Sequence, residues 1–151
     1  MLLAAGCGGI QITRGSPPPG PITAVAVLDF ESQDESHAAG AADGCVMGVL
    51  EAGMRAIERR RVTEMMQERE ASRSGEMGAD FYRQLGEMLG VEAFLVGSIQ
   101  QELGEPGSVV VRLVSAVTGD ILLVYSQGSR RGGLQASDKG RNACRELLRA
   151  L

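Results

Sequence analysis

The stretch over residues 91–125 constrains the fold most, because it holds three apolar runs that turns separate from one another. The runs are rich in valine, isoleucine and leucine, and they cover residues 93–99, 109–117 and 121–125. In the second run, valines at alternate positions lie on both sides, which is typical of a strand buried on both faces. Thr118 and Gly119 follow it, where a tight hairpin needs a residue tolerant of positive φ. The stretch therefore predicts a three-stranded antiparallel core on which most other segments pack.

The length and charge of the chain exclude several classes of protein. A chain of 151 residues predicts one domain, and 44% hydrophobic and 23% charged residues are ordinary for a globular protein. The net charge of −4 argues against nucleic-acid binding, because phosphate contacts need a basic face. Aromatic residues make up 3% of the chain and provide few platforms for base stacking. Since no apolar run reaches about 18 residues, no membrane-spanning helix is predicted.

The chain begins with a short apolar run that ends in small residues before Cys7. This pattern resembles the lipobox of bacterial lipoproteins, in which the cysteine becomes the lipidated first residue of the mature chain. The positively charged start of a signal peptide is missing. We therefore interpret residues 1–7 as a truncated signal peptide with Cys7 as the lipidation site. The alternative is a fortuitous Ala-Gly-Cys sequence in a disordered terminus.

Residues 8–21 are expected to connect this anchor to the domain. The segment is polar and glycine-rich, and its proline triplet at 17–19 favours an extended polyproline form. Such a composition cannot bury a core. We expect a flexible tether or linker over residues 8–21, followed by a single domain over residues 22–151.

The rest of the chain alternates between strand and helix patterns. We predict strands at 22–30 and 54–58, a polar loop at 31–36, a turn at 102–107, and helices at 37–53, 59–70, 79–90 and from about Ser137. The order β-α-β-α-α-β-β-β-α predicts an α/β fold, an α+β sandwich. A mixed sheet of about five strands would have helices on at least one face.

No catalytic constellation is evident in the sequence. His37 lies in the polar loop without further ligands at metal-binding spacing, so we interpret it as solvated and predict no metal and no cofactor. Asp29 and Glu31 follow the first strand and are an acid–base candidate, although acids at strand ends more often cap loops. We therefore expect no enzyme activity and no small-molecule substrate.

Two further groups of residues leave alternatives open. Cys45 and Cys144 both lie on apolar helix stripes; the pattern slightly favours two buried thiols, and a disulfide in an oxidising periplasm is the alternative. Three arginines at 59–61 suit an anionic partner. Nearby glutamates favour a helix start that neutralises itself.

Four segments in order resemble the CsgG family of bacterial lipoproteins, named for the curli secretion channel. They are the opening strand at 24–30, a Glu-Arg helix start at 57–69, a strand of the Leu-Gly-x-x-x-Leu-Val-Gly-Ser-Ile type at 89–99, and a Thr-Gly hairpin at 111–122. The family motif residues, with structural or interaction roles, are Asp29, Phe30, Glu58, Arg59, Glu68, Gly97, Ser98, Thr118 and Gly119. The resemblance implies a periplasmic, anticodon-binding-domain-like α/β fold at the outer membrane.

The resemblance also implies what this chain lacks. The curli channel builds a membrane barrel from two long hairpins in each subunit, at the positions of residues 100–108 and 127–139 here. The first segment is too short for two membrane-crossing strands, and the second lacks alternating apolar residues. Similar domains without these hairpins occur in the penicillin-binding-protein activator LpoB and the flagellar lipoprotein FlgO.

The sequence leads to three hypotheses. The first is a non-enzymatic scaffold or accessory in envelope assembly or secretion. It would be bound to the outer membrane through a lipid on Cys7 and would contact envelope proteins or copies of itself. The alternative is an LpoB-like activator of a peptidoglycan synthase. The last is a small hydrolase that uses Asp29 or Glu31.

Overall fold

A mixed six-stranded sheet forms the centre of the computed structural model, which describes residues 9–71, 78–129 and 134–151. The strand order is β1-β6-β5-β4-β2-β3. The strands are β1 (Ile10–Arg14), β2 (Ala24–Val27), β3 (Arg55–Ala56), β4 (Ala93–Glu102), β5 (Glu105–Ser115) and β6 (Ile121–Gln127).

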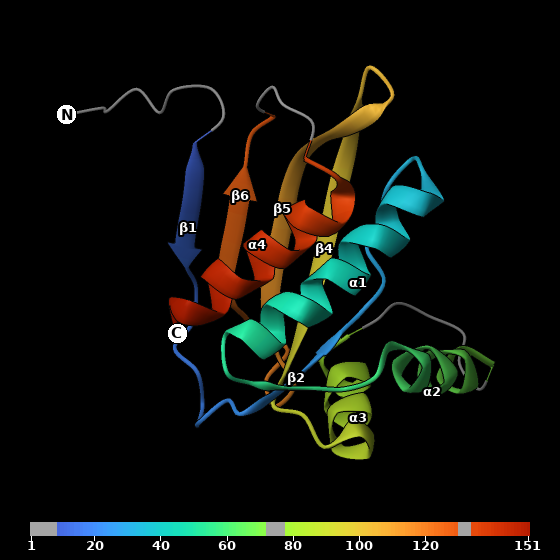
Figure 1. Ribbon diagram of the computed structural model, residues 1–151. Coiled ribbons are helices and arrows are strands. Elements are labelled where there is room, and N and C mark those ends of the chain that lie inside the picture. Colours follow the sequence, from blue (N-terminus) through green and yellow to red (C-terminus); the bar gives the residue numbers. More distant parts are fainter. Residues whose placement is uncertain (1–8, 72–77, 130–133) are drawn as a thin grey trace.

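Helices pack on both faces of this sheet (Figure 1). One hydrophobic cluster joins the sheet to α1 (Glu35–Glu51) and α4 (Ala136–Arg149), and a second joins it to α2 (Arg59–Ala71) and α3 (Ala79–Leu89). The predicted α/β class, with helices on a mixed sheet, is confirmed. Within the described residues, no helix is long and apolar enough to cross a membrane.

The antiparallel core of β4, β5 and β6 is present as predicted. The turn between β4 and β5 is shorter than the predicted 102–107, because the ladder continues until Glu102 faces Glu105. Only Leu103 and Gly104 form the loop, with φ of 51° and 80°. A two-residue hairpin loop with both residues in the left-handed region matches the twist of its strands. Pro106 and Gly107 therefore lie within β5.

The expected tether contributes a strand. Ile10 to Arg14 pair antiparallel with β6, and the backbone of Gly15 and Ser16 continues the hydrogen bonding. The expectation of a flexible segment is therefore wrong for this part of residues 8–21. The proline triplet lies in the connection from β1 to β2. Edge pairing needs only backbone groups, so this strand forms although all five of its residues, including Ile10 and Ile12, are exposed.

Strand β2 is fully buried and lies between β3 and β4, parallel to both. The prediction of a strand at 54–58 beside the first strand is confirmed, although β3 has only two residues. Helix α3 ends at Gly90, which takes the left-handed conformation predicted for its C-cap.

Helices α1 and α4 approach closely because each helix has glycine where the backbone of the other helix lies against it. A Cβ on Gly44 would overlap the carbonyl group of Ser137, and one on Gly140 would overlap that of Ala41. Small residues therefore form the inner face of α1. Leu50, expected on that face, is 59% exposed.

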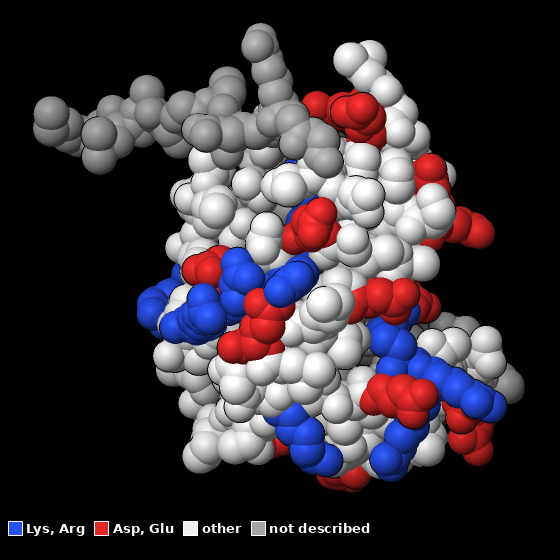
Figure 2. Space-filling model, in the orientation of Figure 1, with Lys and Arg blue, Asp and Glu red and all other residues white. Residues whose placement is uncertain are grey.

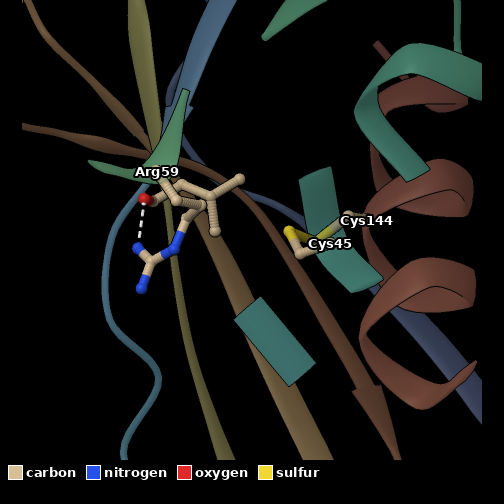
Figure 3. The surroundings of a disulfide bond; sticks show 4 residues. Cys45, Arg59 and Cys144 are labelled. Atoms are coloured by element: carbon tan, nitrogen blue, oxygen red, sulfur yellow. Dashed lines mark hydrogen bonds between the residues drawn. A yellow bond between two sulfur atoms is a disulfide. The ribbon is translucent and has the colours of Figure 1, made fainter. Parts of the chain in front are cut away.

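A disulfide joins Cys45 on α1 to Cys144 on α4, with their Cα atoms 5.2 Å apart (Figure 3). The interpretation as two buried thiols is therefore wrong. Both cysteines lie on the inner faces of their helices, as predicted. They are 99 residues apart in the sequence, and the apolar pattern of each helix does not give the distance between the two cysteines in space.

Candidate functional site

The carboxyl end of β2 brings several predicted motif residues together. Phe30 lies against Gly97 of β4, where an added Cβ would be 2.5 Å from the ring. The backbone of Glu31 bridges to β4 on either side of Ser98, donating to the Gly97 carbonyl at 3.0 Å and accepting from the Ile99 amide at 2.9 Å. Gly97 is therefore needed for a close approach of the Phe30 ring to the sheet.

Arg59, the first residue of α2, contacts the end of β2 and the loop that follows it. Its Nη1 donates to the Val27 carbonyl at 2.7 Å, shown as a dashed line in Figure 3, and its Nη2 contacts Asp29 Oδ1 at 2.5 Å. The Arg59 side chain is 20% exposed, whereas that of Asp29 is 76% exposed. Among the described residues, none accepts a hydrogen bond from the buried Nε of Arg59. The arginine ties the end of β2 to α2 through a buried carbonyl and an exposed carboxylate.

Two shallow hollows flank the loop and share Glu31 and Ser32. One, of 410 Å³, extends to Arg59 and Glu35, and the other, of 580 Å³, extends along Gln100. Asp29 lines the first hollow, but its carboxylate is occupied by the guanidinium of Arg59. The acid–base hypothesis for Asp29 and Glu31 stays a prediction.

His37 does not lie in a loop, because Asp34 caps α1 and the helix begins at Glu35. The Asp34 carboxylate accepts from the Ser36 amide at 2.9 Å, which satisfies a helix N-terminus. His37 is therefore in the first turn, half-buried, with Nδ1 3.9 Å from Asp34 Oδ2. Among the residues that the structure describes, no three potential metal ligands gather.

The remaining motif residues lie elsewhere. Thr118 and Gly119 form the β5–β6 turn, where Gly119 has φ of 78° and a Cβ would meet Ala79 of α3 at 2.8 Å. Glu58, just before α2, and Glu68, within α2, are both exposed. Cys7 lies outside the described residues, so its lipidation stays a prediction. Most of the motif residues that make contacts therefore lie in one of two places. One group meets at the carboxyl end of β2, and the other forms the β5–β6 turn, which lies against α3.

Beyond the area that α2 and α3 cover, no helix among the described residues packs on the second face of the sheet. On this face, opposite α1 and α4, Val96 packs beside the α2–α3 cluster, whereas the half-buried Val110 and Val124 lie among polar residues. Sequence reasoning missed this open face because it took β5 to be buried on both sides. Arg112, exposed between Val110 and Val114, is the signal that would have revealed it. We refer to Val110, Arg112 and Val124 as the open valine face.

Charged side chains of both signs are interleaved over the helices (Figure 2). Arg60 pairs with Glu64 at 3.1 Å, as predicted for a helix start that neutralises itself. On the other helix layer, Glu51 at the end of α1 contacts both Arg141 and Arg145 of α4. The hydrogen bond from Arg141, with that from Arg145, lowers the pKa of Glu51 despite the opposing effect of burial.

Comparisons with known proteins find the same fold in several solved structures. The PelC dodecamer from Paraburkholderia phytofirmans is 15% identical, with a TM-score of 0.55, and the match covers 94% of this chain and 95% of that one. Lipoprotein GNA1162 from Neisseria meningitidis is 21% identical, with a TM-score of 0.57, and the match covers 74% of this chain and 82% of that one.

The LpoB C-terminal domain from Escherichia coli is 11% identical, with a TM-score of 0.53, and the match covers 72% of this chain and 83% of that one. Neither a protein-family model nor a curated protein matches the sequence. At these identities the likeness shows a shared fold, one that lipoproteins use.

Proposed function

We propose that this protein is a lipid-anchored periplasmic domain that assembles with copies of itself and serves as a non-enzymatic accessory in envelope assembly or secretion. The observation that carries the proposal is the match to the dodecameric PelC, which spans nearly all of both chains. The likeness to LpoB covers a smaller share of this chain. A fold matched along nearly its whole length, in a protein that forms a dodecamer, favours self-association.

Two features of the chain support this proposal. The Cys45–Cys144 disulfide fits an oxidising compartment such as the bacterial periplasm. The open valine face offers apolar surface between polar neighbours, as many protein contacts do. In this proposal the protein acts through contacts of its surface with other proteins, and the lipid on Cys7 holds it at the membrane.

The anchor is tested by Cys7→Ser in the full chain, expressed in bacteria with a labelled fatty acid and with a charged start added before Met1 to complete the signal peptide. The wild type should incorporate the label and sediment with membranes, whereas C7S should incorporate none and appear in the soluble periplasmic fraction. Equal labelling and equal sedimentation of the two proteins would refute the anchor. The disulfide, assayed by thiol labelling of the denatured proteins, serves as a check that C7S folds normally.

A second function, activation of a peptidoglycan synthase, is favoured by the likeness to the LpoB C-terminal domain. It differs from the first in its partner, which would be a penicillin-binding protein. Crosslinking in cells followed by capture of this protein should recover such a synthase if the second function holds. Recovery of crosslinked copies of this chain without a synthase would favour self-assembly.

A further inference from the structure

The pairing of β1 with β6 determines how close the domain lies to an anchor at Cys7. Ile10 faces Gln127 and is the first residue of the sheet, so only two residues lie between the lipidation site and the sheet, and Ile10 is three positions after Cys7. An extended chain of that length spans about 10 Å. A domain starting at residue 22 would have had a longer and freer connection.

The β4–β5 hairpin projects from this same end of the sheet. The row that contains Ile10 and Gln127 continues through Val109 to Ile99 of β4. Leu103, at the hairpin tip, is four residues beyond Ile99, and about 3.3 Å per residue places it roughly 13 Å beyond that row. Figure 1 shows the hairpin and the start of β1 at one end of the molecule. The tip therefore reaches at least as far as Cys7 can extend.

Leu103 is an unusual residue for the tip. Its side chain is fully exposed, with a relative accessibility of 104%, and its φ of 51° lies in the region that asparagine and glycine prefer. A leucine at this position costs stability and gains no burial within the chain. Such a residue indicates a role outside the fold.

We propose that this end of the sheet is a membrane-contacting surface, with Leu103 inserted among the lipid headgroups while the chain is anchored. The inference rests on the proposed lipid at Cys7. With the acyl chains in the bilayer, the two-residue connection holds the Ile10 row within about 10 Å of the attachment point, and a tip about 13 Å beyond that row meets the lipid surface. Glu102 and Glu105 flank the tip and are exposed, so the surface suits zwitterionic lipid better than anionic lipid.

The chain contains no tryptophan, so one introduced residue reports on its own surroundings. We would prepare L103W, and V117W as its matched control. Val117 is also exposed, at 59%, but lies in the β5–β6 turn at the opposite end of the sheet. Both lipidated full-length proteins are placed in phosphatidylcholine vesicles in which some acyl chains are brominated. Mass spectrometry first establishes the lipid on Cys7.

The emission of L103W should shift to shorter wavelength and be quenched by the brominated lipid, while V117W emits as in water. If Cys7 carries no lipid, both the anchor and the contact surface are refuted. If Cys7 is lipidated but L103W is quenched no more than V117W, the contact surface alone is refuted. A blue shift of L103W without quenching would indicate a protein contact, which also overturns the proposal.

Hydrogen exchange of the unsubstituted chain gives a second readout in case L103W folds poorly. Amides of residues 100–108 in the lipidated wild type on vesicles should exchange more slowly than those of C7S in solution, whereas residues 116–120 should not differ. Equal exchange at 100–108 would overturn the proposal.

Discussion

Arg59 Nη2 and Asp29 Oδ1 lie 2.5 Å apart although 30 residues separate them in the sequence. The same guanidinium donates to the carbonyl of Val27, which is fully buried. The exposed ion pair contributes little to stability, because solvent screens it. The contact with the buried carbonyl matters more, since an unpaired buried acceptor bears its full desolvation cost.

Replacing Arg59 with Met should therefore lower the free energy of unfolding by about 1–3 kcal/mol, because the Val27 carbonyl loses its donor. Arg60→Met removes only an exposed ion pair with Glu64 and should change the free energy of unfolding by less than about 0.5 kcal/mol. Urea unfolding of both variants gives the comparison. Equal losses would show that the carbonyl contact is not the stabilising one.

Gly44→Ala should destabilise the protein by about 1–3 kcal/mol, because the added methyl overlaps the Ser137 carbonyl and pushes α4 away from α1. Gly40→Ala, on the same helix, meets its nearest atom at 3.7 Å and should stabilise by up to about 1 kcal/mol through helix propensity. Thermal unfolding separates the two outcomes. A G44A variant as stable as G40A would contradict the close helix contact.

Loss of the disulfide should destabilise the domain strongly, since it closes a loop over 99 residues of sequence. The chain-entropy argument gives about 4–5 kcal/mol for a loop of this length. The double variant Cys45→Ala, Cys144→Ala should unfold at a lower temperature and ignore reductant, whereas the wild type should lose stability when reduced. A wild type indifferent to reductant would argue against the bond.

The ion pairs of Glu51 should make stability depend on pH. Its pKa in the folded protein lies below the ordinary value of 4.5, chiefly through the hydrogen bond from Arg141. The unfolded chain therefore binds this proton more readily. The stabilisation is fully present above about pH 4.5 and is lost as pH falls through the folded-state pKa.

Glu51→Gln should accordingly be less stable than the wild type at pH 7, and the difference should shrink below pH 4.5. Glu87→Gln, an exposed position on α3, serves as the control and should differ from the wild type by the same small amount at both pH values. Melting temperatures at pH 7 and pH 3.5 measure both. A constant difference for E51Q would show that its ion pairs do not carry the effect.

The core of the fold was predictable because its signals are local. The valine-rich runs and the Thr-Gly turn predict the antiparallel strands, and Gly90 marks the end of α3. Strand β1 was missed because it is a short edge strand with all five residues exposed, and it forms through backbone pairing with a strand over 100 residues away. Its neighbouring prolines pointed to a tether.

The candidate site was predictable only as a set of residues. The motif includes Asp29, Arg59, Phe30 and Gly97, yet which of them meet depends on how β2 and β4 align. The disulfide and the glycine contact between α1 and α4 likewise depend on the packing of distant helices. Glycine at 44 and 140 looks like weak helix propensity in the sequence, whereas in the structure it permits the close approach.

The central claim, self-assembly of this domain, is tested most directly by its mass in solution. Light scattering of residues 9–151 after size-exclusion chromatography, across a range of protein concentrations, measures that mass without a partner. We predict one closed oligomer with several times the mass of a single chain. A monomer at every concentration would contradict the claim and would favour an adaptor of the LpoB kind.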